Sequence, residues 1–306
     1  CMAEYDNIMH QAEQQVDVNG IRINYDAFGD RQNPAIVLIM GLATQMIFWD
    51  EGFCRQLAAN GFWVLRFDNR DIGKSSWMTK AKTPGVFAFL SNGLFGKRLK
   101  APYLLSDMAA DTLGLLDALK LPNAHLVGVS MGGMIAQTIA IEAPQRVLSL
   151  TSIMSTTGDR ALPKPKKSDA LKLMTPPPKE KHAYIKHAAD IWQLLHGSHF
   201  HFERDKIELQ LGIARERGFN PKGISRQLAA IIASPDRTDA LAHLKMPCLV
   251  IHGDQDPLIL VECGRATAKA IKQAELLIYP GMGHTLPSEL HGDIIKHISQ
   301  MAKSVS

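Results

Sequence analysis

The pattern Gly128-Val129-Ser130-Met131-Gly132 is the feature of the sequence that points most directly to chemistry. It follows an apolar run typical of a buried strand and precedes a run typical of a helix, the context that a G-x-S-x-G motif requires. A serine at such a tight turn stands beside a helix N-terminus, whose free N–H groups favour developing negative charge. Side chains two residues before or after it would collide, which explains the glycines. The motif predicts that Ser130 is a nucleophile.

A nucleophilic serine needs a base and a carboxylate that orients this base. Two candidates follow Ser130 in the order acid, then histidine: Asp256 in GDQDP after the apolar run CLVIH, and His284 in GMGH after ELLIY. Loops after parallel strands gather at one edge of a sheet, so we expect the three side chains to meet there. Asp254 is a competing acid. We prefer Asp256 because a carboxylate further along the loop reaches over the strand end more easily.

An attacked carbonyl carbon passes negative charge to its oxygen, and this charge needs N–H donors. The expected donors are the backbone N–H of Met131 and one from the loop after the apolar run AIVLIM. That loop reads Met40-Gly41-Leu42-Ala43. We choose the N–H of Leu42, since Gly41 supplies the flexible turn before it. Each such donor is worth about 10²–10³ in rate.

The elements that must position these residues alternate along the chain. A hairpin is predicted at Asn19-Gly20, because both residues tolerate positive φ. Strands that alternate with helices indicate an α/β fold with a mainly parallel sheet. The predicted strands are 13–18, 21–25, 35–40, 62–67, 124–129, 147–154, 246–252 and 275–279, and the predicted helices are 53–60, 107–119, 132–141, 261–271 and 291–302.

Two segments interrupt this alternation. Residues 158–240 have helical stretches, proline-rich joints and no convincing strand, which predicts a helical insertion in an α/β core formed by 1–157 and 241–306. Residues 80–102 carry the apolar and then basic stretch GVFAFLSNGLFGKRLK. This stretch is interpreted as structural packing against the insertion, with a substrate flap or a lipid-interface element as alternatives.

The composition of the 306 residues excludes several classes of protein. The 34 Lys and Arg against 30 Asp and Glu leave a net charge of +4, too mild and dispersed for a nucleic-acid-binding surface. No apolar run approaches the ~18 residues that a transmembrane helix needs, and the first residues do not resemble a secretory signal. The four cysteines have no C-x-x-C spacing, which favours a reducing compartment. We therefore expect a cytoplasmic protein without stable membrane insertion.

Two further groups of polar residues, a histidine triplet and a charged run, could have a function. The triplet His196, His199 and His201 could suggest a metal, but its Gly, Ser and Phe neighbours favour an ordinary loop of the insertion. The charged run from Asp68 to Ser75 follows a predicted strand. It is interpreted as a buried turn network that braces the sheet, because polar turn residues usually satisfy backbone groups.

The segments YDAFGD, LIMGLATQ, FDNRDIGKSS, GVSMGGMIAQ, ASPDR, VIHGDQDP and PGMGHTLP resemble those of the α/β-hydrolase superfamily, and within it the aclacinomycin methylesterase-type esterases. The resemblance covers almost the entire chain. It implies Ser130 as nucleophile, Asp256 as acid and His284 as base, in agreement with the reading of the residues. It also implies a helical cap over the active site, which matches 158–240. Many members of the superfamily have His-Gly where this chain has Met40-Gly41, and the methylesterases share that departure.

The predicted function is a serine carboxylesterase that cleaves a small-molecule ester through an acyl-enzyme, without a metal or an organic cofactor. The same three side chains could run perhydrolysis, lactone hydrolysis or C–C bond hydrolysis instead. A non-catalytic ligand receptor is disfavoured because Ser130, Asp256 and His284 are all present. A homodimer is left open.

Overall fold

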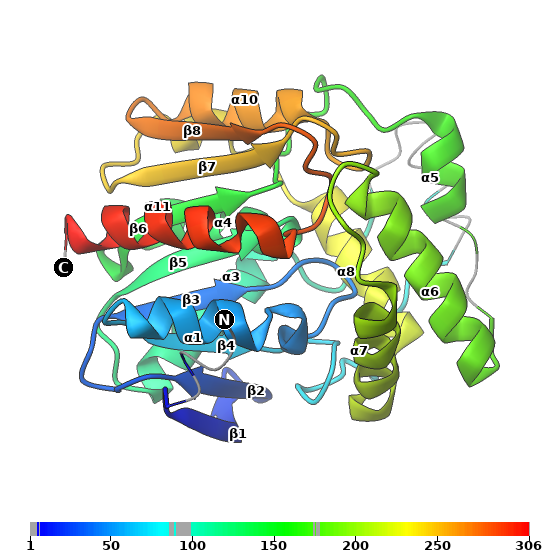
Figure 1. Ribbon diagram of the computed structural model, residues 1–306, viewed down its shortest axis with the longest axis horizontal. Helices are drawn as coiled ribbons and strands as arrows, with labels where there is room; N and C mark the ends of the chain where they lie inside the picture. The colour runs from blue at the N-terminus through cyan, green and yellow to red at the C-terminus, as the bar shows by residue number, and fades with distance from the viewer. Residues whose placement is uncertain are drawn as a thin grey trace.

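The computed structural model describes residues 5, 7–85, 89, 99–173, 175 and 178–305. Within these residues, eight strands form one sheet in the order β1-β2-β4-β3-β5-β6-β7-β8 (Figure 1). The strands are β1 (His10–Val18), β2 (Ile21–Phe28), β3 (Ala35–Ile39), β4 (Trp63–Phe67), β5 (Ala124–Val129), β6 (Val147–Ile153), β7 (Cys248–Gly253) and β8 (Ala274–Tyr279). The sheet confirms the predicted α/β class.

The first two strands form the predicted hairpin. Asn19 and Gly20 have φ angles of 50° and 79°, as the tight turn between twisted strands requires. β1 and β2 pair antiparallel, β2 pairs antiparallel with β4, and all pairs from β4 to β8 are parallel. The hairpin is longer than the predicted strands 13–18 and 21–25, because β1 begins at His10, which pairs with Phe28 of β2.

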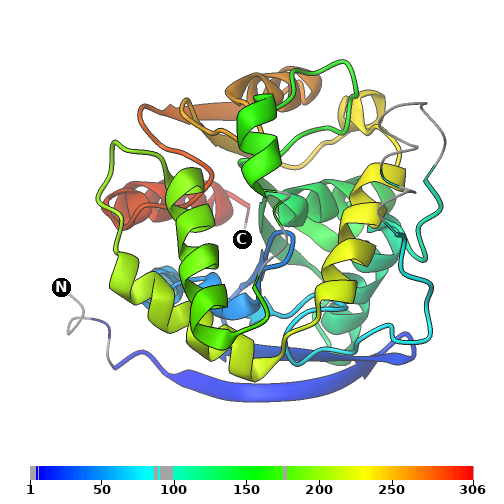
Figure 2. The same cartoon turned by 90° about the vertical axis from the view of Figure 1, so that its right-hand side faces the viewer.

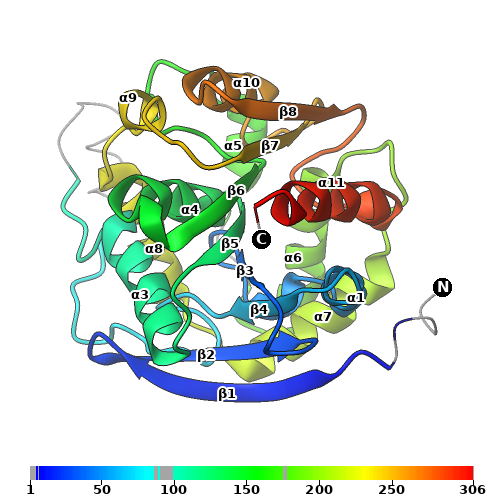
Figure 3. The ribbon, with the colours of Figure 1, turned by 90° about the vertical axis from the view of Figure 1, so that its left-hand side faces the viewer.

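Helices cover both faces of the sheet (Figure 3). One face carries α1 (Glu51–Ala59) and α11 (His291–Lys303), and the other carries α3 (Leu105–Ala118), α4 (Met131–Glu142) and α10 (Val261–Ala270). Asp50 starts α1, since its carboxylate accepts the N–H of Phe53 at 3.2 Å. Two hydrophobic clusters, one on each face, hold the layers together. Short 3-10 helices are η2 (Met46–Phe48), η3 (Pro144–Arg146) and η4 (Ser288–Leu290).

Between β6 and β7 the chain forms only helices among the described residues of 158–240. We call this segment the helical insertion. Its helices are α5 (Lys167–Leu173), α6 (Lys181–His196), α7 (Arg204–Arg217), α8 (Pro221–Ala233) and α9 (Thr238–Leu241). Helices α5 to α8 lie beyond the carboxyl ends of the parallel strands (Figures 1 and 2). The insertion therefore stands over the edge of the sheet where the candidate residues were expected.

The apolar and basic segment predicted at 80–102 lies mostly outside the described residues, which omit 86–88 and 90–98. Its interpretations as packing, flap or lipid-interface element stay predictions. Across the ranges that the structure covers, no helix is both long and apolar enough to cross a bilayer.

Two buried ion pairs fasten the helical insertion to the core. Arg226 of α8 forms a double contact with Asp71, at 2.6 and 2.7 Å, and Tyr103 donates its hydroxyl to the same carboxylate. Arg217 of α7 contacts Asp68 at 3.0 Å. Asp68 and Asp71 belong to the turn after β4, which is buried as the sequence predicted. Its pairing with arginines of the insertion was not predicted.

Replacing Arg226 by methionine should lower the free energy of unfolding by about 3–5 kcal/mol, because the Asp71 carboxylate would stay buried without its partner. Urea unfolding followed by circular dichroism measures this change. Lys206→Met is the matched control, since Lys206 also joins the insertion to the core, through Asp50 at 3.0 Å, but is half exposed. Its loss should stay below about 1 kcal/mol. Equal losses in the two variants would contradict the prediction.

Candidate active site

The turn between β5 and α4 holds Ser130 in a backbone conformation that L-residues rarely adopt, with φ 55° and ψ −121°. Hydrogen bonds to both backbone groups of Ser130 fix this turn. The Ser130 N–H donates to the carbonyl of Ile153 at 2.9 Å, and the Ser130 carbonyl accepts from the Ser155 hydroxyl at 2.8 Å and from the Gly133 N–H at 2.9 Å. Strain of this kind persists only where the surrounding structure enforces it. The Ser130 side chain is half-buried at the carboxyl edge of the sheet.

The two glycines of the motif are required by lack of space, as the sequence predicted. A Cβ added at Gly128 would lie 2.2 Å from the carbonyl oxygen of Gly132. A Cβ added at Gly132 would lie 2.0 Å from the carbonyl oxygen of Ile39, at the end of β3. The helix after the serine is thus pressed against two strands, which brings the loop after β3 close to Ser130.

Asp256 and His284 lie beside Ser130 and are joined to it in a chain of hydrogen bonds. His284 Nδ1 is 2.6 Å from Asp256 Oδ2, and His284 Nε2 is 3.0 Å from Ser130 Oγ. An ionised carboxylate can only accept, so the ring proton resides on Nδ1 and Nε2 presents its lone pair to the serine hydroxyl. Asp256 and His284 are 4% and 9% exposed, respectively, so the hydrogen bond between them is buried, whereas the bond from His284 to Ser130 is partly buried.

Backbone N–H groups and histidine rings stabilise the negative charge of the Asp256 carboxylate. Its Oδ1 accepts the N–H groups of Leu258 and Ile259, both at 2.9 Å. Burial alone would raise the pKa of Asp256, but the rings of His284 and His252 outweigh this effect and hold the pKa well below its usual value. His252 is fully buried and its Nε2 lies 3.4 Å from Asp256 Oδ2. The sequence patterns do not predict this proximity.

The competing acid, Asp254, makes a different contact. Its Oδ1 accepts the N–H of Gly281 at 2.7 Å, and the residue is exposed. This bond ties the loop after β7 to the loop after β8. The hydrogen bond to His284 Nδ1 comes from Asp256, the carboxylate that the sequence analysis preferred.

The loop after β3 forms a tight turn against Ser130. The Thr44 N–H donates to the Gly41 carbonyl at 3.4 Å, and Ala43 has a φ of 62°. A Cβ added at Gly41 would lie 3.2 Å from Ser130 Cβ and 3.7 Å from its Oγ. Leu42 therefore follows a residue in contact with Ser130, and Met131, the other expected donor, is the first residue of α4.

The helical insertion contacts the loop that carries His284. The His284 N–H donates to the Leu195 carbonyl at 2.6 Å, and His196 Nδ1 is 2.8 Å from the Thr285 hydroxyl. His196 is therefore part of a junction between α6 and this loop. In the part of the chain that the structure describes, no three His, Cys, Asp or Glu side chains are grouped to hold a metal ion. Sequence motifs cannot reveal the Leu195 contact, because every residue type has a backbone carbonyl.

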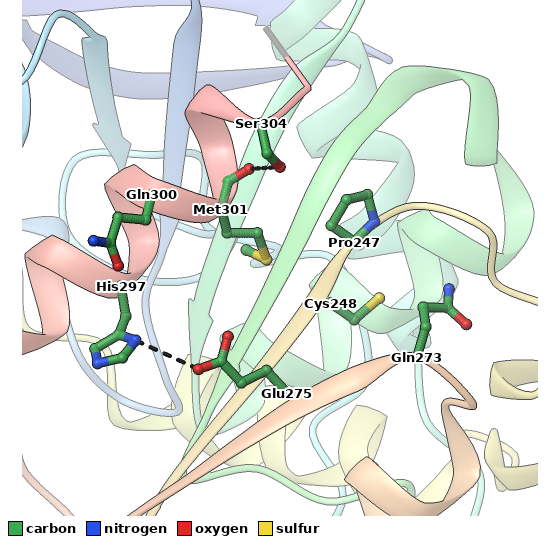
Figure 4. A pocket seen from close by; sticks show the side chains of 8 residues that line it. All are labelled: Pro247, Cys248, Gln273, Glu275, His297, Gln300, Met301 and Ser304. Atoms are coloured by element: carbon green, nitrogen blue, oxygen red, sulfur yellow. Dashed lines mark hydrogen bonds and ion pairs between the residues drawn. The ribbon is translucent and has the colours of Figure 1, made fainter.

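A separate pocket of about 360 Å³ lies at the opposite end of the strands, between the start of β7 and the end of α11 (Figure 4). His297 and Glu275 form an ion pair across it at 3.5 Å. Its one thiol belongs to Cys248, which is buried, and burial raises the pKa of this thiol to about 12. A thiol of this kind stays protonated at neutral pH and is a poor nucleophile. The pocket lacks the chemistry found around Ser130.

Comparison with known proteins gives a consistent picture. Rhodomycin D methylesterase of Streptomyces sp. strain C5 is 28% identical over 87% of this chain and 90% of its own length. The rhodomycin D methylesterase of Streptomyces peucetius is 26% identical with the same coverage of both chains. These two relatives confirm the predicted resemblance to methylesterases.

The fold also matches solved structures. The enol-lactonase from Burkholderia xenovorans LB400 superposes with a TM-score of 0.71 at 22% identity, covering 95% of this chain and all of the other. A family model described as the alpha/beta hydrolase fold matches residues 34–289, a range that contains Ser130, Asp256 and His284. The chain belongs to the α/β-hydrolase-fold family.

Proposed function

We propose that this protein hydrolyses carboxylic esters through an acyl-enzyme, with Ser130 as nucleophile, His284 as base and Asp256 as the residue that orients the base. The observation that carries the proposal is the continuous chain of hydrogen bonds from Asp256 Oδ2 to Ser130 Oγ through both nitrogens of His284. Membership of the hydrolase family and the methylesterase relatives support an ester as the substrate class. Methyl esters are the first candidates within that class.

In the acylation step, His284 Nε2 takes the proton of the Ser130 hydroxyl while Oγ forms a bond with the ester carbonyl carbon. The carbonyl oxygen becomes an oxyanion. His284 then passes the proton to the ester oxygen as the carbon–oxygen bond breaks, and the alcohol leaves. In the second step a water gives a proton to His284 while its oxygen forms a bond with the acyl carbon. The bond between this carbon and Ser130 Oγ then breaks, His284 returns the proton to Oγ, and the acid leaves. Water is the only co-substrate that this sequence of steps consumes.

The backbone N–H groups of Leu42 and Met131 would stabilise the oxyanion. Met131 supports this role because it is the first residue of α4, where a helix N–H has no partner within the helix. Gly41 supports the role of Leu42, since it packs against the Ser130 side chain. The low pKa of Asp256 keeps a negative charge beside the imidazolium that forms during each step.

We further propose that residues 1–157 and 241–306 form the catalytic core and that the helical insertion, 158–240, is a cap over its active site. The position of α5 to α8 at the carboxyl edge of the sheet supports this division (Figure 2). The contact of Leu195 with His284 supports it as well.

The described free cysteines, Cys54, Cys248 and Cys263, are all buried, in keeping with a cytoplasmic enzyme.

Replacing Ser130 by alanine should lower kcat for p-nitrophenyl acetate by about 10⁶-fold, because the members of such a catalytic unit act together. The wild type should also be labelled covalently by a fluorophosphonate probe, and the variant should not. Ser149→Ala is the matched control, since Ser149 is a buried serine that contacts His125 away from the site. Activity of Ser130→Ala within tenfold of the control would contradict the proposal.

Replacing Asp256 by asparagine should lower kcat by about 10⁴-fold. The asparagine amide donates to His284 Nδ1, which moves the ring proton to Nε2. A protonated Nε2 can no longer accept the proton of the Ser130 hydroxyl. Asp254→Asn is the matched control in the same loop, because Asp254 contacts Gly281 instead. Steady-state kinetics of both variants distinguish the two acids. A larger loss in Asp254→Asn would reverse the assignment.

A further inference from the structure

We propose that Gln227 of the helical insertion is a positioning residue for the reaction, because its side chain holds the loop that carries the Leu42 N–H donor. The inference deepens the proposed function and depends on it. Gln227 lies on α8, and the loop after β3 belongs to the core, so the two are far apart in the sequence. The proposal makes the helical insertion part of the catalytic apparatus as well as a cover over it.

Gln227 is fully buried and uses both ends of its carboxamide. Its Oε1 accepts the backbone N–H of Ala43 at 3.1 Å, and its Nε2 donates to the carbonyl of Arg70 at 2.8 Å. One partner is a pure donor and the other a pure acceptor, so only this orientation of the amide satisfies both. Removal of the side chain would leave an N–H and a carbonyl of the core without these bonds.

The Leu42–Ala43 peptide is held at both of its polar groups. Gln227 accepts from the Ala43 N–H, and the Leu42 carbonyl accepts from the Thr44 hydroxyl at 2.9 Å. The preceding peptide is oriented by the Gly41 carbonyl, which accepts the Thr44 N–H. In a trans peptide the N–H and C=O point in opposite directions. Fixing the Gly41 carbonyl inside the turn therefore directs the Leu42 N–H out of it.

This turn needs external support because of its backbone. Ala43 has a φ of 62°, a conformation that is unfavourable for a residue with a side chain. A flip of the Leu42–Ala43 peptide would relieve the strain at Ala43, but it would change the ψ of Leu42 and turn the Ala43 N–H away from Gln227. The hydrogen bond from Ala43 to Gln227 selects the strained conformation, since it forms only when the Ala43 N–H faces α8.

Both ends of the loop and the helix behind it are fixed. Asn69 donates to the Met40 carbonyl at 3.0 Å, and Gln45 donates to the Ala214 carbonyl at 2.6 Å. Arg226, the neighbour of Gln227 on α8, forms the buried pair with Asp71. Gln227 therefore extends from a fixed helix to a loop that is fixed at both ends. Its hydrogen bond with the Ala43 N–H is the contact that reaches the peptide next to the proposed donor.

The test compares Gln227→Met, which keeps the size of the side chain but forms neither hydrogen bond, with the wild type on p-nitrophenyl acetate. An oxyanion donor acts mainly in the transition state, so kcat should fall by about 10–10²-fold while KM changes by less than about threefold. The rate of labelling by a fluorophosphonate should fall with kcat. Thermal unfolding of each variant reports any accompanying loss of stability.

Ser234→Ala is the matched control, because Ser234 ends the same helix and accepts the N–H of Leu105 in the core at 2.9 Å. This variant loosens α8 without touching the loop, so its kcat should remain within about threefold of the wild type. A kcat of Gln227→Met within threefold of the wild type would overturn the inference. Equal kcat losses in Gln227→Met and Ser234→Ala would also overturn it, since the effect would then be general loosening.

Gln227→Glu gives a second readout with a pH signature. Burial raises the pKa of a carboxyl group, and the protonated acid can both accept from Ala43 and donate to Arg70, as the amide does. The ratio of its kcat to that of the wild type should therefore rise as pH falls from about 9 to about 6. Dividing by the wild-type value removes the pH dependence that the two enzymes share. A ratio independent of pH would contradict the proposal.

The two proposals fail in different ways. A Ser130→Ala variant that stays active removes the proposed function, and the Gln227 inference falls with it. An inactive Ser130→Ala variant together with a fully active Gln227→Met variant leaves the esterase mechanism intact and rejects only the role of Gln227.

Discussion

The strained turn at Ser130 is the constraint on which the rest of the site depends. A serine at φ 55° costs of the order of 1–3 kcal/mol and persists only because its neighbours enforce it. The enforcement comes from β6, through the carbonyl of Ile153, and from the packing of Gly132 on the end of β3. The same contact fixes where the loop after β3 begins. A relaxed turn would therefore displace the Ser130 side chain and the loop containing Leu42 together.

The site draws on both the sheet and the helical insertion. The strands supply Ser130, Asp256 and His284 from the loops at their carboxyl ends. The insertion supplies the Leu195 carbonyl to the His284 backbone and Gln227 to the loop after β3. An α/β sheet fixes the ends of its strands well, but the loops beyond them need contacts from elsewhere. The insertion provides those contacts at the loops after β3 and β8.

The parts predictable from sequence are those governed by local pattern. β5 runs from Ala124 to Val129, as the apolar run indicated, and α4 begins at Met131, one residue before the predicted start. The three chemistry-bearing side chains lie in hydrogen-bond contact because parallel strands end at one edge, a rule of topology that the sequence reveals. Their catalytic roles remain predictions.

The contacts that sequence reasoning missed are long-range. Gln227 and Ala43 belong to different segments of the fold, and no spacing rule relates a buried glutamine to a distant backbone N–H. Only the geometry reveals the proximity of His252 to Asp256. The histidine triplet was interpreted as an ordinary part of the insertion, and its residue types did not predict the hydrogen bond between His196 and Thr285. Residue type predicts chemistry well only where the backbone context is also known.

The ion pairs between the insertion and the core limit how the site can open. Undocking α7 and α8 would separate Arg217 from Asp68 and Arg226 from Asp71. It would also break the hydrogen bond between Gln227 of α8 and the loop after β3. An enzyme that works as proposed therefore needs α8 docked while it acts, because Gln227 holds this loop only from that position. The proposed mechanism requires a route for substrate to Ser130 that leaves α8 in place.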